Sequence, residues 1–480
     1  MSFVESTLVP ALYLLSAVLF ILGLKGLTRV KTAQRGNLFS AVAMLVAVLA
    51  TLLELGQISY TWILAGLAIG GLIGAVGALK VEMTSMPEMV ALLNGSGGGA
   101  SALVAASLLW GGVIEPDAGS TAWDIMGPAP AITTVLSLLI GALTLSGSVI
   151  AFMKLSGKMS GNPILLPGRH VVNALLLSGS LGLGLWGMTS VAEAGTLSTV
   201  AAAVLVLAFA LGIMLVIPIG GADMPVVISL LNSYSGIAAS ATGFVLMNNV
   251  LIISGALVGA SGLILTQIMC VAMNRTLSNV LFGGFGGEEA AGAGTGAAAR
   301  DYGPVKSYSS EEAALVLENA ESVVFVPGYG LAVAQAQHTV RDLAALLEKR
   351  GAKVTYGIHP VAGRMPGHMN VLLAEADVPY DQLLEMDLVN PEFRNTDVVI
   401  VVGANDVVNP AAEKSEGSPI YGMPVLEVWN AGTIIMIKRS LSPGFAGIKN
   451  ELFEYDNTMM LFEDAKKAVQ GIVTELKELE

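Results

Sequence analysis

The sequence predicts two parts with different folds. A polytopic α-helical membrane domain of about nine transmembrane helices comes first, and a C-terminal α/β domain with a doubly wound parallel sheet follows. Of the 480 residues, 54% are hydrophobic and only 13% are charged, whereas soluble domains carry about 25% charged residues. Apolar segments fill residues 1–280, and strand-like and helix-like segments alternate over 306–480. The Gly/Ala-rich stretch 281–305 between them is typical of a flexible linker.

Each membrane segment approaches the roughly 20 apolar residues that a helix needs to cross a bilayer. The spans are expected near 7–27, 38–54, 58–79, 86–110, 130–153, 170–188, 197–218, 222–247 and 249–272. The first span lacks a basic leader and a clear cleavage site, so we interpret it as retained.

Basic residues follow the first, third, fifth and ninth spans, which places all of them on one side of the membrane. Because basic loops face the cytoplasm, the C-terminal domain is predicted to be cytoplasmic and the N-terminus to lie outside. The basic residues are Lys25, Arg29, Lys31, Arg35, Lys80, Lys154, Lys158, Arg169 and Arg275.

Three polar residues lie in the apolar segments, Asn94, Asp223 and Asn232, and the two asparagines are candidates for lining a water path. Polar groups in lipid must be satisfied inside the bundle. The alternative for the two asparagines is interhelical hydrogen bonding, and the alternative for Asp223 is capping of the eighth span. The many glycines in the spans mainly indicate close helix packing.

Charge also divides the chain. Residues 1–280 carry nine basic and nine acidic residues, so the remainder supplies the whole net charge of −13. An acidic soluble half argues against nucleic acid as a partner. The single cysteine, Cys270, excludes a disulfide framework within the chain. We assign no metal site.

The soluble half has the alternating pattern of a Rossmann-like sheet wound on both faces. Residues 458–462 lead into an amphipathic helix that runs to the C-terminus. Strands are expected at 323–326, 353–357, 397–402, 425–429 and 433–437, and helices at 332–350 and 369–376.

The first of these strands runs into a turn in which Gly328, Gly330 and Val333 have G-x-G-x-x-V spacing. A strand that feeds a helix through such a turn aims free backbone N–H groups at one point, where a pyrophosphate fits. Glycine is expected because a Cβ would block the phosphate or forbid the turn. The alternative is an ordinary strand-to-helix turn.

Ligands of such sheets bind at the carboxyl ends of the strands. The second strand ends at His359 without the acidic residue that an NAD site usually has, whereas Lys438, Arg439 and Ser440 follow a later strand. Two cations and a hydroxyl suit a phosphate, which favours NADP over NAD. The alternative is a surface Lys/Arg pair. The four groups at the strand ends are Gly328–Gly330, His359–Arg364, Gly403–Asp406 and Lys438–Ser440.

With these residues in view, nearly the whole chain resembles the β subunit of proton-translocating nicotinamide nucleotide transhydrogenase. The resemblance rests on five blocks: Gly220–Gly236, Val326–Gln337, Gly357–Ala376, Gly403–Ala412 and Lys438–Gly447. It implies hydride exchange between NAD(H) and NADP(H) of the Si-specific/Re-specific type, coupled to proton movement across the cell (inner) membrane. It also implies NADP(H) bound here in reversed orientation, NAD(H) held on an α-type partner subunit, and a dimer of multi-subunit protomers in lipid.

The resemblance assigns roles residue by residue. Phe445 and Gly447 match a lid loop, although family members often have Tyr at the position of Phe445. Asp406 matches an acidic residue linked to the state of the NADP site. The full set of cofactor-binding residues implied is Gly328, Tyr329, Gly330, Val333, Arg364, Gly403, Asn405, Asp406, Lys438, Arg439, Ser440, Phe445 and Gly447.

Asp223 and Asn232 match polar positions that the family ties to proton translocation. Asn94 stands where well-known members have a histidine, and an amide does not titrate. A partner subunit could supply the titrating group, which we favour, or water and Asp223 could suffice. Direct hydride transfer needs no general acid or base, so no catalytic residue is assigned. His359 and His368 are interpreted as satisfied loop histidines or sensors of the nucleotide state. The alternative functions are a secondary transporter, or another membrane protein, with an NADP-sensing regulatory domain, and a membrane anchor for an NADP-binding module.

Overall fold

The computed structural model describes residues 7–28, 30–54, 60–110, 120–274, 276–283, 302–365, 367–418, 420–444 and 446–479. The chain forms two compact units, Met1–Gly221 with Val227–Thr266, and Ala222–Val226 with Gln267–Glu480. Most of the predicted linker, residues 284–301, lies outside the described residues.

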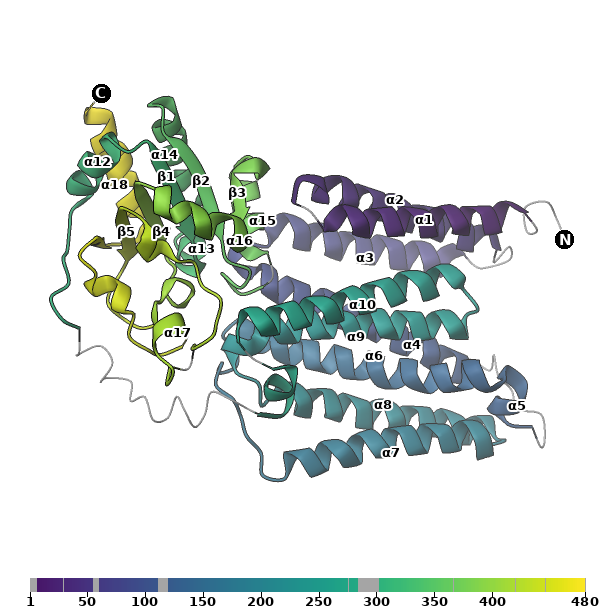
Figure 1. Cartoon of the computed structure of the whole chain (residues 1–480). Coiled ribbons are helices and arrows are strands. Elements are labelled where there is room, and N and C mark those ends of the chain that lie inside the picture. The colour runs from purple at the N-terminus through teal and green to yellow at the C-terminus, as the bar shows by residue number, and fades with distance from the viewer. Residues whose placement is uncertain are drawn as a thin grey trace. The chain divides into compact units, whose positions relative to one another are not determined.

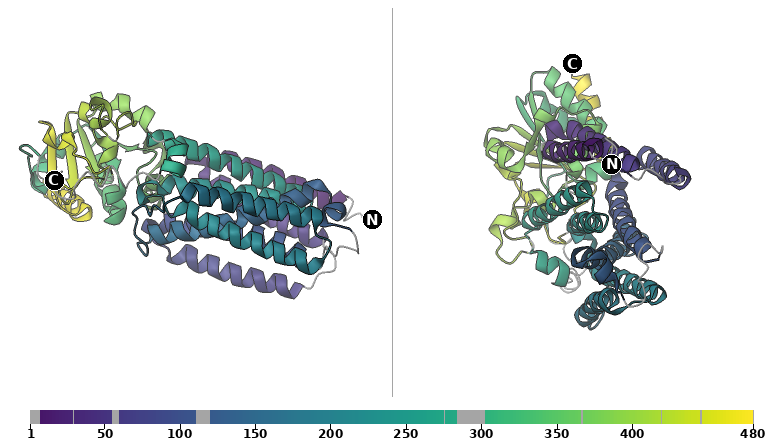
Figure 2. Two further views of the ribbon diagram at one scale, coloured as in Figure 1. Left: turned by 90° about the horizontal axis from the view of Figure 1, so that it is seen from below. Right: turned by 90° about the vertical axis from the view of Figure 1, so that its right-hand side faces the viewer.

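The first unit is a bundle of long helices that run along a common direction in Figures 1 and 2. Nine helices in the described part of the chain are long and apolar enough to cross a membrane, which confirms the predicted membrane fold. They are α1 (Val9–Leu27), α2 (Val30–Glu54), α3 (Tyr60–Lys80), α4 (Met86–Trp110), α6 (Pro128–Leu155), α7 (Arg169–Ser190), α8 (Ala194–Val216), α9 (Met224–Val245) and α10 (Asn249–Ala272).

Glycines let these helices approach each other closely. A Cβ on Gly98 of α4 would fall 2.9 Å from the carbonyl oxygen of Gly141 of α6. A Cβ on Gly236 of α9 would fall 2.5 Å from the backbone nitrogen of Gly259 of α10. Real Cβ atoms do not sit this close, so alanine at either position would push the helices apart. These glycines therefore act in helix packing, as the sequence indicated.

Helix α3 differs from its neighbours because none of its residues is buried. Its Gly66, Gly70, Gly71 and Gly74 have no heavy atom within 4 Å of an added Cβ among the described residues. The glycine-rich face of α3 is thus open in this chain.

The second unit contains a six-stranded, all-parallel sheet with the strand order β3-β2-β1-β4-β5-β6. This is the strand order of a doubly wound Rossmann sheet, so the predicted fold class is confirmed. The central strands are buried on both faces, as expected for parallel sheets covered on both sides. The strands are β1 (Ser322–Pro327), β2 (Lys353–Ile358), β3 (Leu383–Glu385), β4 (Val398–Val402), β5 (Thr433–Lys438) and β6 (Thr458–Phe462).

One face of the sheet is covered by regular helices. Helix α18 (Ala465–Glu478) packs against α12 (Ser310–Glu318) and α14 (Gln337–Lys349), as Figure 1 shows. Phe325 and Tyr356 stack on this face with ring centroids 5.3 Å apart.

The other face is covered by short helices, turns and loops. The side chain of Val324 points there because side chains alternate along a strand. It packs in one core with Phe393, Leu426 and Phe453. The remaining short helices of this unit are α13 (Tyr329–Val333), α15 (His368–Glu375), α16 (Met386–Val389) and α17 (Ala411–Lys414).

The helix predicted at 332–350 is wrong in its first turns. Helix α13 ends at Val333, and Gln335 takes a left-handed conformation (φ 49°) before α14 begins. The Ala336 N–H donates to the Leu331 carbonyl at 3.1 Å, which closes α13 in the manner of a Schellman motif. Glycine usually occupies such a position, so the glutamine gave no signal of the break.

The strand predicted at 425–429 is also wrong. This segment crosses the face of the sheet and ends in a 3₁₀ turn, Val428–Asn430. Its apolar side chains Leu426 and Val428 are fully buried in the core beneath it. Burial produced the apolar pattern, and pattern alone cannot separate a buried strand from a buried crossing segment. The edge strand β3 was not predicted because only three residues form it.

A buried lysine near the end of α6 binds backbone carbonyls of the segments that follow α6 and α8. Lys154, near the end of α6, is 5% exposed. Its Nζ donates to the carbonyl oxygens of Ile217 (2.6 Å), Ile219 (2.7 Å) and Asn162 (3.3 Å). Ile217 and Ile219 lie just beyond α8, so the ammonium binds carbonyl oxygens of the chain that leaves this helix. The Ile217 carbonyl also accepts from the Ile164 N–H at 3.3 Å.

We therefore expect Lys154→Met to destabilise the membrane unit. Each buried acceptor that loses its donor costs about 1–3 kcal/mol, so the thermal unfolding midpoint of the purified protein should fall clearly. Lys158→Met is the matched control because Lys158 is exposed four residues further on. Equal midpoints for the two variants would contradict the role assigned to Lys154.

Candidate functional site

The turns after β1 and β4 are in direct backbone contact. A Cβ on Gly328 would fall 2.4 Å from Ala404 Cα, and one on Gly330 would fall 2.7 Å from Gly403 Cα. Gly403 itself has a positive φ of 68°. Glycine is thus required at these positions because the two turns pack against each other.

The same contact uses N–H groups that the sequence analysis expected to be free. Gly328 N–H donates to the Val402 carbonyl and Gly330 N–H donates to the Gly403 carbonyl, both at 2.9 Å. The N–H groups of Gly328 and Gly330 are therefore not free, and a pyrophosphate site at this turn stays a prediction. They join the two turns at the point between β1 and β4 where the strand order reverses.

Lys438 ends β5 at the same carboxyl edge of the sheet. Its Nζ donates to the Ser442 carbonyl at 2.6 Å and lies 5.0 Å from the centroid of the Phe453 ring. Burial lowers the pKa of Lys438 to about 8, while the Asp406 carboxylate acts in the opposite direction. The side chain is thus a half-buried cation that titrates just above neutral pH.

The loop after β5 lies against the turn after β4. The Asn405 amide oxygen accepts from Lys438 Nζ (3.2 Å) and from the Gly444 N–H (2.6 Å), because the opposite amide orientation would put an NH₂ group against an ammonium. Asp406 Oδ2 accepts from the Ala446 N–H at 2.9 Å. A Cβ on Gly444 would fall 2.3 Å from Asp406 Oδ1. Two predicted groups, those after β4 and β5, are thus brought together.

The turn after β2 reaches the turn after β1 through stacked side chains. The Arg364 guanidinium lies 4.4 Å from the Tyr329 ring centroid, and the Tyr329 ring lies 6.3 Å from the His368 ring. His368 Nδ1 accepts from the Arg364 N–H at 3.0 Å. Tyr329 and Arg364, both predicted site residues, are therefore neighbours.

His359 is a satisfied loop histidine. It is 1% exposed; its Nδ1 accepts from the Val361 N–H (3.3 Å), so its Nε2–H donates to the Pro424 carbonyl (2.8 Å). Burial lowers the pKa of His359 to about 4, with the hydrogen bond to Pro424 opposing this shift. The ring stays neutral at physiological pH, which favours the satisfied-loop interpretation over a sensor.

The remaining predicted residues lie around this edge. Arg439 and Ser440 are exposed directly after β5, and Ser440 Oγ donates to Ser442 Oγ at 2.9 Å. Val333, at the end of α13, is 46% exposed. Gly447 has a φ of 68° and its N–H donates to the Gly444 carbonyl. Phe445 lies outside the described residues.

In the membrane unit, Asn94 of α4 is buried and its Nδ2 donates to the Ile228 carbonyl of α9 at 3.1 Å. This is the interhelical hydrogen bond that the sequence left as one alternative. Asn232 is half-buried one helical turn beyond Ile228, on the same side of α9. Asp223 is 6% exposed at the end of the 3₁₀ turn Gly221–Asp223 that precedes α9.

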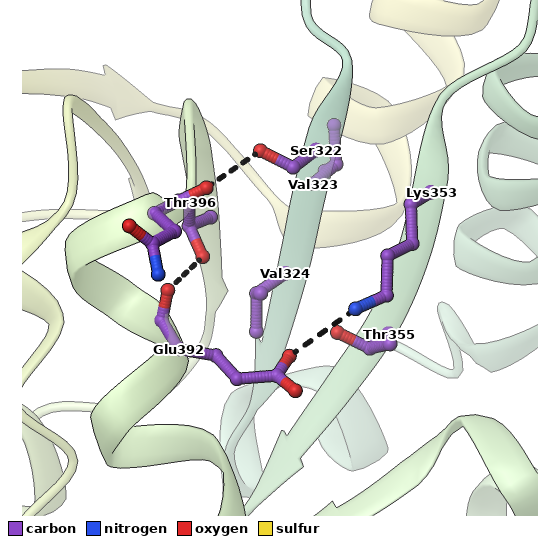
Figure 3. A pocket seen from close by; sticks show the side chains of 8 residues that line it. Ser322, Val323, Val324, Lys353, Thr355, Glu392 and Thr396 are labelled. Atoms are coloured by element: carbon purple, nitrogen blue, oxygen red, sulfur yellow. Dashed lines mark hydrogen bonds and ion pairs between the residues drawn. The ribbon is translucent and has the colours of Figure 1, made fainter.

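A small pocket lies at the opposite, amino-terminal edge of the sheet (Figure 3). Lys353 and Glu392 point toward each other across it, with 3.6 Å between Nζ and Oε2. Both side chains are largely exposed, so this pair contributes little. The pocket is far from the strand ends where ligands of such sheets bind.

Sequence reasoning missed three residues that support the site. Asn450 is fully buried and its Nδ2 donates to the Asn405 carbonyl at 3.1 Å. Phe453 lies beneath the Lys438 ammonium, and Tyr302 stacks on Phe453. These contacts join segments far apart in the chain, and no local pattern indicates them.

A bundle of membrane-crossing helices on one chain with a Rossmann-type sheet defines an integral membrane protein that carries a dinucleotide-type fold. The family model described as “NAD(P) transhydrogenase beta subunit” matches residues 9–475. Two curated relatives described as “NAD(P) transhydrogenase subunit beta”, from Rhodospirillum rubrum and from a named strain of that species, are each 51% identical over 468 residues. The alignments cover 97% of this chain and 98% of each relative. The chain therefore belongs to the NAD(P) transhydrogenase beta subunit family, and the predicted resemblance is confirmed.

The contact between the two turns leads to a stability prediction. Gly330→Ala should lower the thermal unfolding midpoint of the purified protein, because inserting a methyl group into a close-packed contact costs about 1–3 kcal/mol. Gly417→Ala is the control, because no heavy atom of the described residues lies within 4 Å of a Cβ added at Gly417. Similar midpoints for both variants would show that the turns can separate without cost.

Proposed function

We propose that this transhydrogenase subunit binds NADP(H) at the carboxyl edge of its sheet and exchanges hydride with NAD(H) held on an α-type partner subunit. Lys438 carries the proposal: it is a half-buried cation at the end of β5, followed by Arg439 and Ser440. Two cations and a hydroxyl form a donor set that fits a phosphate monoester, the group that distinguishes NADP from NAD.

Other residues would shape the site around the cofactor. Tyr329 and Arg364 present a stacked aromatic and cationic pair beside the turn after β1. Asn405 orients Lys438, and Asp406 holds the loop 440–447 through the Ala446 N–H. Gly328, Gly330 and Gly403 keep the two turns together, while Phe445, Gly447 and Val333 complete the proposed set.

When bound, the cofactor supplies the nicotinamide that gives or takes a hydride. The task of this chain is then to bind, orient and exclude water, because hydride transfer requires the reacting carbons about 3–3.5 Å apart and no acid or base between them. His359, neutral and doubly hydrogen-bonded, fixes the turn after β2 and takes no proton in this scheme.

We further propose that the membrane unit moves protons in step with the NADP(H) site. Asn94 of α4 donates to the Ile228 carbonyl of α9, Asn232 lies one turn further along α9, and Asp223 is a buried carboxyl group at the start of α9. Asn94 cannot titrate, so a partner subunit supplies the titrating group. Protonation would change NADP(H) affinity, and binding would change proton affinity by the same factor. Asp406 belongs to this coupling path.

The α-type subunit is the proposed partner, in a dimer of multi-subunit protomers in the inner membrane. The open glycine face of α3 supports additional transmembrane helices from another chain. The positive-inside pattern supports a cytoplasmic NADP(H) domain, with residues 1–280, 281–305 and 306–480 as membrane domain, linker and nucleotide domain.

The first test compares NADPH and NADH binding to the full-length protein. Lys438→Ala combined with Arg439→Ala should weaken NADPH binding by at least roughly 100-fold, since each of the two charge-assisted hydrogen bonds contributes about 1.5–3 kcal/mol. NADH binding should be weak in both proteins. Titration by NADPH fluorescence gives the affinities.

Lys466→Ala combined with Lys467→Ala is the matched control, because it removes two exposed lysines from α18. An NADPH affinity that tolerates loss of Lys438 and Arg439, or an absence of preference over NADH, would refute the cofactor assignment. A secondary transporter with a nucleotide sensor would then become the better proposal.

The pKa of Lys438 gives a pH prediction. Only the protonated lysine attracts the phosphate, so affinity is complete below the pKa of about 8 and falls as pH rises through it. Between pH 7 and pH 9, NADPH affinity should decrease by up to about tenfold. In Lys438→Arg the guanidinium stays charged, so the curve should be flat over this range. A flat curve in the unaltered protein would contradict the prediction.

A further inference from the structure

After residues 284–301, the second unit continues in the described residues with a segment that is hydrogen-bonded to β6 and contacts residues beneath the candidate site. We call residues 302–308 the anchor segment; it directly follows residues 284–301 in the sequence. Tyr308 N–H donates to the Met460 carbonyl (2.9 Å), and Met460 N–H donates to the Lys306 carbonyl (3.1 Å). These bonds place the anchor segment alongside β6.

Tyr302, at the start of the anchor segment, contacts two residues that support the site. Its ring stacks on Phe453 with centroids 5.7 Å apart and planes inclined by 22°. Its hydroxyl oxygen accepts from the Asn450 N–H at 3.1 Å. The Lys449 ammonium lies 5.2 Å from the centroid of the Tyr302 ring.

Each of these two residues touches a proposed cofactor-binding residue. Phe453, 1% exposed, carries the Lys438 ammonium 5.0 Å from its ring centroid. Asn450 donates to the Asn405 carbonyl at 3.1 Å. Two separate routes, one through stacked rings and one through hydrogen bonds, therefore join Tyr302 to the site.

We propose that Tyr302 is a positioning residue that ties the anchor segment to the NADP(H) site, so that occupancy of the site changes how tightly the anchor segment is held. The inference rests on the proposed function and adds a regulatory connection to it. The chain between the anchor segment and α10 leads back to the membrane helices. Occupancy of the site at Lys438 and Asn405 would thus affect the connecting chain through the anchor segment.

The reasoning is physical. A phosphate bound at Lys438 restricts the ammonium, and the ammonium restricts the Phe453 ring beneath it. Tyr302 packs against that ring in a buried contact, so its own freedom falls too. By linkage, a change that loosens the anchor segment must weaken binding of the cofactor at the site.

The test is hydrogen exchange of the full-length protein in nanodiscs, with and without saturating NADPH. In the unaltered protein, the backbone amides of residues 303 and 305–308 should exchange more slowly when NADPH is bound. In Tyr302→Leu, NADPH should bind about threefold to tenfold more weakly, and at saturation the anchor segment should no longer respond. Tyr302→Phe keeps the stacked ring and should restore most of both effects.

Tyr308→Leu is the control, because Tyr308 lies in the same segment and joins Met460 through its backbone. It should leave the response to NADPH in place. Unchanged exchange of the amides of residues 303 and 305–308 in the unaltered protein at saturating NADPH overturns the inference and leaves the proposed function intact. A response that persists in Tyr302→Leu also overturns it. Absence of NADPH binding by the unaltered protein overturns both.

Discussion

The candidate site depends on the backbone contact between the turns after β1 and β4. Gly328, Gly330 and Gly403 have no side chains, so the two turns touch and exchange hydrogen bonds. This contact fixes Asn405 relative to the first turn, and Asn405 in turn holds Lys438. A glycine pattern that is typical of phosphate-binding turns thus also has a structural role here, which is to hold two strand ends of the sheet together.

The membrane unit solves a related problem in the same way. Without a hydrophobic driving force between helices in lipid, close packing and hydrogen bonds have to hold the bundle together. Gly98 faces Gly141, and Gly236 faces Gly259. Where helices meet closely, polar groups such as Asn94 can reach carbonyls of the neighbouring helix. Any function of the polar residues between the helices therefore depends on these close glycine contacts.

Much of this architecture could be predicted because its signals are local. The nine spans, the strands β1, β2, β4 and β5 and the C-terminal helix each have a composition that their own solvent or sheet position dictates. The break at Gln335 and the crossing segment 425–429 could not, because tertiary packing decided them.

For the site, the sequence indicated the strand ends, where Lys438 and Asp406 do lie close together. It could not indicate Asn450, Phe453 or Tyr302. Their neighbours are 45, 15 and 151 positions away in the chain (450 minus 405, 453 minus 438, and 453 minus 302). Only the folded sheet brings such residues together. The use of the Gly328 and Gly330 N–H groups was hidden for the same reason.

Lys154 has one more consequence for the membrane unit. Its three carbonyl partners replace the water molecules that would otherwise solvate the ammonium, so backbone oxygens solvate the buried charge. Sliding α6 along the end of α8 would break these hydrogen bonds and leave a buried ammonium without acceptors. The segment that leads into α9 is therefore locked in register with α6.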